Sequence, residues 1–137
     1  KTLTPKDKGN VVSKQQRKML ISAEKMQSIA IKLEQAMKED KLFLDESISL
    51  HTISERTSES ENHISETLSQ HLKTNFFQYV NGFRIEQAKA SLQDRSKQIT
   101  SIAYDVGFNS RSTFNNAFKK LVGTSPTSYR NTFFQDE

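Results

Sequence analysis

The chain has 137 residues, of which 34% are hydrophobic and 26% charged, a balance suited to one ordinary domain with a small core. It has no cysteine, which excludes disulfide scaffolds and thiolate sites, and no apolar run long enough to span a membrane. The formal charge of +4 is compatible with a polyanionic partner without requiring one. Because the first residue is Lys rather than Met, we expect a piece of a longer protein.

The N-terminal segment is the most basic part of the chain. Residues 1–20 carry six bases and one acid, contain Pro5 and Gly9, and lack helical periodicity. We therefore predict a flexible basic arm over 1–21. Three roles are compatible with this arm: a solvated linker, a DNA-tracking arm or a segment just inside a membrane.

A helical pattern begins at Ser22 and predicts an N-terminal helix over 22–40. Apolar side chains fall on one face at the spacing of an α-helix: Met26, Ile29, Ala30, Leu33 and Met37. Ser22 is suited to cap the first turn. We expect this Met26–Met37 stripe to pack on the domain that follows, with a short dimerising coiled coil as the alternative.

The rest of the chain has the pattern of further helices, and no stretch alternates apolar and polar residues as a half-buried strand would. The predicted helices span about 49–56, 61–72, 76–93, 98–106, 111–121 and 127–133. Two segments resemble each other at an offset of 49 to 50 residues, for example Ile53 with Ile102 and Leu68 with Phe118. We predict an all-α fold built on two copies of one unit.

The second copy, over 98–122, has the spacing of a helix-turn-helix. Ala103 is small where a second helix must cross, and Gly107 stands at the turn, where a positive φ is easiest without a Cβ. Ser110 is placed to cap the next helix. Together these features predict a unit that presents its second helix to the major groove of DNA.

The exposed face of that second helix carries side chains that read base edges. Arg111 suits guanine, and Asn115 and Asn116 suit adenine, while Lys119 and Lys120 suit phosphates. The opposite face is predicted to be core: Phe114, Ala117, Phe118, Leu121 and Val122.

The first copy, over 48–73, has weaker signals. Its second helix is predicted to bury Ile64, Leu68 and Leu72 and to expose four polar residues: Asn62, Ser65, Glu66 and Ser69. Ser58 and Glu59 stand where the second copy has Gly107 and Phe108, and a left-handed non-glycine residue costs roughly 1 kcal/mol. We expect this unit to be less stable and to bind DNA more weakly.

Three segments resemble the DNA-binding domain of AraC/XylS-type bacterial transcription regulators. They are IAYDVGFNSRSTFNNAFKKLVGTSPTSYR at 102–130, FFQYVNGFRIEQAKASL at 76–92 and KLFLDESISL at 41–50. The resemblance covers roughly Lys41–Phe133. It implies seven helices: two helix-turn-helix subdomains joined by a long linker helix over 76–94, a last helix over 126–134, and the additional N-terminal helix in front of a domain over 41–137.

The resemblance also implies partners and site residues. It implies binding to double-stranded promoter DNA, contact with RNA polymerase and transcription regulation, which we expect to be activation, as the output domain of a larger sensor protein. The family's base-reading positions fall on Arg111, Ser112, Thr113, Asn115 and Asn116, and, in the first unit, on Asn62, His63, Ser65, Glu66 and Ser69. The first unit departs from the family pattern at four positions: Ser54, Ser58, Glu59 and Lys73. These departures leave the expected fold intact but count against base reading by this unit. Arg130 has two open roles, a phosphate contact or a structural pair.

Other function classes have little support in the sequence. The residues predict no catalytic group, metal site, cofactor or small-molecule ligand, because His63 and His71 lie about 12 Å apart along one helix and no phosphate loop appears. Single-stranded RNA binding would favour exposed aromatic residues that the predicted faces lack. A helical protein-interaction module using the Met26–Met37 stripe is the alternative function. We expect a cytoplasmic location, with the cytoplasmic part of a membrane-anchored protein as the alternative, and a homodimer formed through the N-terminal helix or an upstream region remains open.

Overall fold

A computed structural model describes residues 21–134, and within that range the chain is helical and has no strand. In chain order the elements are α3 (Ala23–Lys38), a 3-10 turn η1 (Leu42–Leu44), α4 (Leu50–Thr57), α5 (Glu61–Glu66), a π-helical turn η2 (Thr67–His71), α6 (Phe76–Ser91), α7 (Ile99–Asp105), α8 (Arg111–Val122) and α9 (Pro126–Asn131). The predicted all-α fold is confirmed. The predicted basic arm lies outside the described residues, apart from Ile21.

Short polar side chains set where the helices begin. Ser22 and Ser110, both predicted as caps, accept hydrogen bonds from the backbone N–H groups of Lys25 and Thr113. Ser49, Ser60, Asn75 and Ser125 do the same for α4, α5, α6 and α9. Each cap satisfies one of the N–H groups that the first helical turn leaves unpaired.

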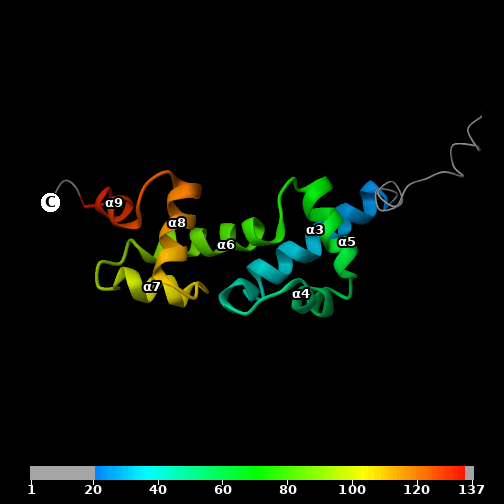
Figure 1. Ribbon diagram of the computed structural model, residues 1–137, viewed down its shortest axis with the longest axis horizontal. Helices are drawn as coiled ribbons and strands as arrows, with labels where there is room; N and C mark the ends of the chain where they lie inside the picture. The colour runs from blue at the N-terminus through cyan, green and yellow to red at the C-terminus, as the bar shows by residue number, and fades with distance from the viewer. Residues whose placement is uncertain (1–20, 135–137) are drawn as a thin grey trace, which may run out of the picture.

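Within residues 21–134, buried side chains form two hydrophobic cores, one in each helix-turn-helix unit. The first core combines buried side chains of α3, η1, α4, α5, η2 and the start of α6, including Ile53 of α4 and Ile64 of α5. The second core combines the end of α6 with α7 and α8 and includes Phe114 and Phe118. Because α6 contributes to both cores, it is the linker helix that the sequence predicts (Figure 1).

Helix α3 is an integral part of the first unit. Ile29, Leu33 and Met37 are fully buried there, and Met26 and Ala30 are half-buried. The stripe therefore packs on the domain that follows, as expected. Its centre is consequently not free for the alternative function, docking of a partner protein, or for a dimerising coiled coil.

Three predicted helices differ from the observed ones. The linker helix ends at Ser91 rather than at 94, because Gln93 and Asp94 donate to the carbonyls of Ala90 and Ser91 in tighter turns. The last helix ends at Asn131 rather than 134. The helix expected over 61–72 is interrupted, since Leu72 N–H donates to the carbonyl of Thr67 and widens the last turn into a π-helical one.

Candidate nucleic-acid interface

The turn of the second unit requires glycine. Gly107 has a φ of +112°, and a Cβ there would overlap the carbonyl oxygen of Phe43 and approach the guanidinium of Arg84. Both of those groups belong to elements outside the second unit. Gly107 therefore permits both the predicted turn and close contact between the second unit and the linker region.

Helix α8 divides into a buried and an exposed face, as its sequence predicts, but Leu121, which was predicted to be core, is 50% exposed. Phe114 and Phe118 are fully buried, and their rings lie 5.7 Å apart between centroids. The exposed positions that we predicted to contact DNA are Ser112, Thr113, Asn116, Lys119 and Lys120, while Arg111 and Asn115 are half-buried. The structure thus brings the second unit's predicted α8 residues together on one helix, which carries three basic side chains and no acidic one.

The side chain of Arg111 is already held at the start of α8. Its Nε donates to Oδ1 of Asn115 at 3.3 Å and its Nη1 donates to Oγ1 of Thr100 at 2.5 Å. A guanidinium held in this way loses less rotamer entropy when it binds a base edge. Thr100, which sequence reasoning missed, is recognisable only from the fold, because it comes from α7.

The turn of the first unit uses a strained serine. Ser58 has a φ of 62°, the left-handed conformation expected from its alignment with Gly107. Ser54, another departure from the family pattern, donates its hydroxyl to the carbonyl of Glu59 at 2.6 Å. The hydroxyl therefore supports the turn that follows α4, and the departure has a structural role.

Glu59 occupies the place of a buried phenylalanine and is itself buried. Its carboxylate is 2.6 Å from Nζ of Lys32 and 3.1 Å from Nζ of Lys25, both on α3. The hydrogen bond from Lys32, aided by Lys25, lowers the pKa of Glu59 below its ordinary value, against the opposing effect of burial. The turn of the first unit is thereby tied to α3. Sequence reasoning missed this contact, although two lysines seven residues apart, and so on one face of a helix, were a signal of it.

The reading helix of the first unit, meaning the second helix of the unit and the one predicted to contact base edges, is formed by α5 and η2. Asn62, His63, Ser65 and Ser69 are exposed, as expected, but Glu66 is 8% exposed, and its Oε2 has no hydrogen-bond partner within 21–134. The prediction that Glu66 is exposed for base reading is therefore wrong. Both α3 and α4 pack against this segment, and a helical wheel of one helix cannot include that cover.

Arg130 is used within the protein. Its Nε donates to the carbonyl of Leu92 at 2.8 Å, and its Nη2 donates to the carbonyls of Asp94 and Lys97 at 3.1 and 2.7 Å. These bonds close the loop between α6 and α7. The geometry favours the structural role of the two that the sequence left open, with backbone carbonyls in place of an acidic partner.

The histidines carry no metal-binding arrangement in the part of the chain that the structure describes. His51 is 69% exposed and lies near the exposed carboxylates of Glu55 and Glu61, at 3.3 and 3.5 Å. No three His, Asp or Glu side chains among residues 21–134 are grouped to hold an ion. Over the same range, no helix is long and apolar enough to cross a membrane.

Comparisons with known proteins agree with this geometry. A family model described as a helix-turn-helix domain matches residues 53–132. An uncharacterised helix-turn-helix transcriptional regulator of Staphylococcus aureus is 36% identical over 89 residues, which are 65% of this chain and 12% of that relative. Most of the relative's length therefore has no counterpart in this chain.

Solved structures show the same fold. The C-terminal domain of AraT, a response regulator from Geobacillus stearothermophilus, matches with a TM-score of 0.65 and 29% identity, over 74% of this chain and 84% of that one. The DNA-binding domain of the transcriptional factor AdpA, in complex with a target DNA, matches with a TM-score of 0.66 and 18% identity, over 79% of this chain and 94% of that one. At that identity the second likeness concerns the fold alone.

Proposed function

We propose that this chain, which belongs to the helix-turn-helix family of AraC-type DNA-binding domains, binds double-stranded promoter DNA sequence-specifically and regulates transcription. The observation that carries the proposal is the exposed face of α8, which presents Asn116, Lys119 and the held Arg111 with no acid on the helix. Such a face combines donors for base edges with cations for phosphates.

The arrangement of the two units supports binding on one side of the duplex. The reading helices α5 and α8 lie at either side of the N-terminal part of α6 (Figure 1). Helix α6 has 16 residues and thus a length of about 24 Å. Successive major grooves on one side of B-DNA are about 34 Å apart. With the flanking turns, the linker is of the right order to direct both helices to adjacent grooves.

The two units contribute unequally in this proposal. Helix α8 carries three basic side chains and no acidic one, whereas α5 and η2 carry Glu61 and Glu66 and neither Lys nor Arg. The second unit therefore supplies most of the affinity, through Arg111, Ser112, Asn115, Asn116, Lys119 and Lys120. The first unit adds a weaker contact through Asn62, His63, Ser65 and Ser69. Thr113 contributes mainly to the cap, because its hydroxyl accepts from Ser110 at 2.8 Å.

The whole protein's role rests on the family. We propose that this domain is the output part of a larger cytoplasmic or membrane-anchored sensor protein, that it activates transcription and that it contacts RNA polymerase. These roles follow from membership of the AraC-type family.

A gel-shift titration tests DNA binding directly. A duplex selected by this chain from a randomised library should bind with an affinity that falls steeply as salt rises, because Lys and Arg displace counterions from phosphates. Arg111→Ala should weaken binding about tenfold or more. The control, Arg56→Ala, removes an exposed arginine paired with Asp40 in the first unit and should bind like wild type. Salt-independent binding, or equal affinities of both variants, would refute the proposal.

A further inference from the structure

An open cleft lies between the N-terminal end of α6 and the C-terminal half of α8. It has a volume of about 570 Å³ and is lined on one side by Asn75, Phe77 and Gln78 of the α6 N-terminus and on the other by Lys120 and Leu121 of α8. Asn75 lies four residues after His71, the last residue of η2, so the cleft is lined by the C-terminal half of α8 and by residues that follow the second helix of the first unit in the chain.

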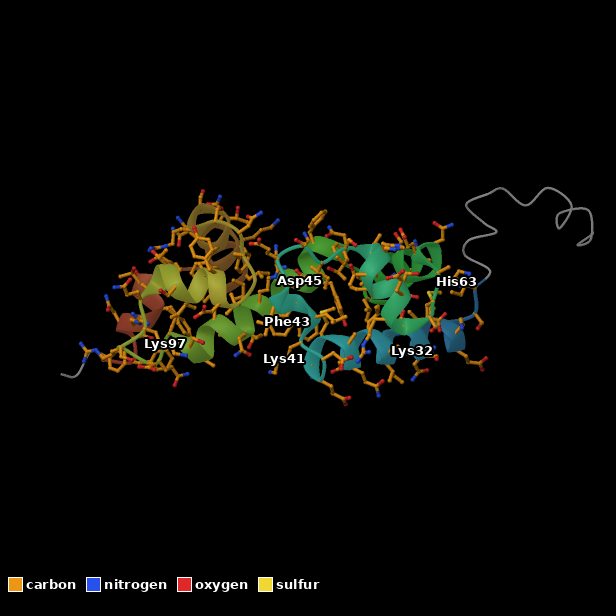
Figure 2. All side chains as sticks on the ribbon, turned by 90° about the horizontal axis from the view of Figure 1, so that it is seen from below. Lys32, Lys41, Phe43, Asp45, His63 and Lys97 are labelled. Carbon is orange, nitrogen blue, oxygen red and sulfur yellow. The ribbon has the colours of Figure 1, made fainter. Side chains whose placement is uncertain are left out.

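The cleft borders the face of α8 that carries the predicted base contacts. On the wheel of α8, Lys120 lies about 40° from Asn116, at the edge of the base-reading face. In Figure 2, α5 and α8 lie toward the upper side of the molecule, and α3, with the labelled Lys32, lies toward the lower side. A duplex engaged by both helices must therefore pass over the cleft.

The apolar part of the lining is unusually exposed. Phe77 is 74% exposed and Leu121 is 50% exposed. Phe77 packs edge-on against Phe76, with ring centroids 5.5 Å apart, and is the most exposed of the large hydrophobic residues within 21–134. An aromatic side chain held on a helix between two DNA contacts is suited to lie against deoxyribose or a base step.

The polar part of the lining presents hydrogen-bond donors. The side-chain oxygen of Asn75 accepts from the backbone N–H of Gln78 at 2.9 Å, and that of Gln78 accepts from the hydroxyl of Thr74 at 3.4 Å. Both side-chain NH₂ groups are thereby directed away from these contacts, and Lys120 adds a cation. No acidic residue lines the cleft. The lining is thus complementary to phosphate oxygens and to the acceptors of the minor groove.

We propose that this cleft is a third DNA contact, which holds the stretch of duplex between the two sites read by α5 and α8. Phe77 lies against the sugars of that stretch, and Lys120, Asn75 and Gln78 bind its phosphates. The proposal rests on the proposed function, since it needs a duplex engaged by both units. It adds DNA-binding residues on the linker helix, outside both reading helices.

Two chemical footprints on the selected duplex test the contact. Hydroxyl radicals report on deoxyribose, and dimethyl sulfate reports on guanine in the major groove. We expect wild type to protect the sugars between the two major-groove sites. Phe77→Ala and Gln78→Ala should lose that protection, and Phe77→Ala should weaken binding roughly fivefold, while both keep the guanine protections.

The matched control is Ile31→Ala, which truncates a 51% exposed side chain on α3, and it should footprint like wild type. Thermal unfolding of each variant checks that the fold is retained. Guanine protection in wild type without sugar protection between the sites, or sugar protection that both cleft variants keep, would overturn the proposal; the cleft would then be free for a partner protein. If wild type protects neither guanines nor sugars, the proposed function is instead refuted.

Discussion

Arg84, on the linker helix, donates from Nε to the carbonyl oxygen of Phe43 at 2.7 Å, and this bond ties the linker helix to the segment that precedes α4. The same guanidinium donates from Nη2 to the carbonyl of Asp45 at 3.0 Å and lies 5.4 Å from the centre of the Phe108 ring. Phe43 and Asp45, both labelled in Figure 2, precede α4, whereas Phe108 directly follows Gly107 in the chain. The burial of this guanidinium lowers the pKa of Arg84 from its ordinary value, without removing its charge at neutral pH. One side chain therefore links both helix-turn-helix units.

Arg84→Ala should lower the free energy of unfolding by about 2 to 4 kcal/mol, because it leaves two carbonyls without their charged donor and opens a gap beside Phe108. Urea denaturation measures the change. Arg56→Ala, at an exposed ion pair, should cost less than about 1 kcal/mol. Equal losses in the two variants would show that Arg84 does not link the units.

Gly107→Ala should be more destabilising than Gly123→Ala. Both glycines have a positive φ, +112° and +94°, so both variants bear the left-handed strain of roughly 1 kcal/mol. Only at Gly107 would the new Cβ also meet Phe43 and Arg84, whereas nothing lies within 4 Å at Gly123. Comparison of the two urea midpoints isolates the inter-unit contact, and a difference of zero would argue against it.

Ser58→Gly should stabilise the first unit by about 0.5 to 1 kcal/mol, since glycine adopts the left-handed conformation at φ 62° without the Cβ penalty. A rise in the thermal midpoint measures this. The same substitution at Ser60, where the hydroxyl caps α5, should bring no gain. A fall in stability of Ser58→Gly would mean that the serine side chain contributes more than its strain costs.

The ion pairs of Glu59 should make stability depend on pH in the acid range. Because the folded pKa lies below the ordinary value of 4.5, the unfolded chain binds the proton more tightly. The contribution is therefore fully present above pH 4.5 and is lost as the pH falls through the folded pKa. The stability difference between wild type and Glu59→Gln, measured in urea at pH 7 and in steps down to pH 3.5, should shrink on acidification. Glu55→Gln, at an exposed carboxylate, serves as the control, and a pH-independent difference for Glu59→Gln would contradict the assignment.

The sequence predicted most of this fold because its helices are locally encoded. The stripe of α3, the caps Ser22 and Ser110 and the φ of Gly107 all follow from residues close in the chain. It could not predict contacts between distant elements. The burial of Glu66 and the position of Thr100 beneath Arg111 depend on neighbouring helices, which a wheel of one helix omits.

We propose that α8 reads bases and holds phosphates through different residues. The most direct test is the ratio of affinities for the selected duplex and for random DNA, measured at one salt concentration for Asn115→Ala and Lys119→Ala. We predict that Asn115→Ala lowers the ratio, by about fivefold or more, because the base contact and the hold on Arg111 are both lost. Lys119→Ala should weaken both affinities alike and leave the ratio unchanged. Equal ratios for wild type and both variants would contradict base reading by α8.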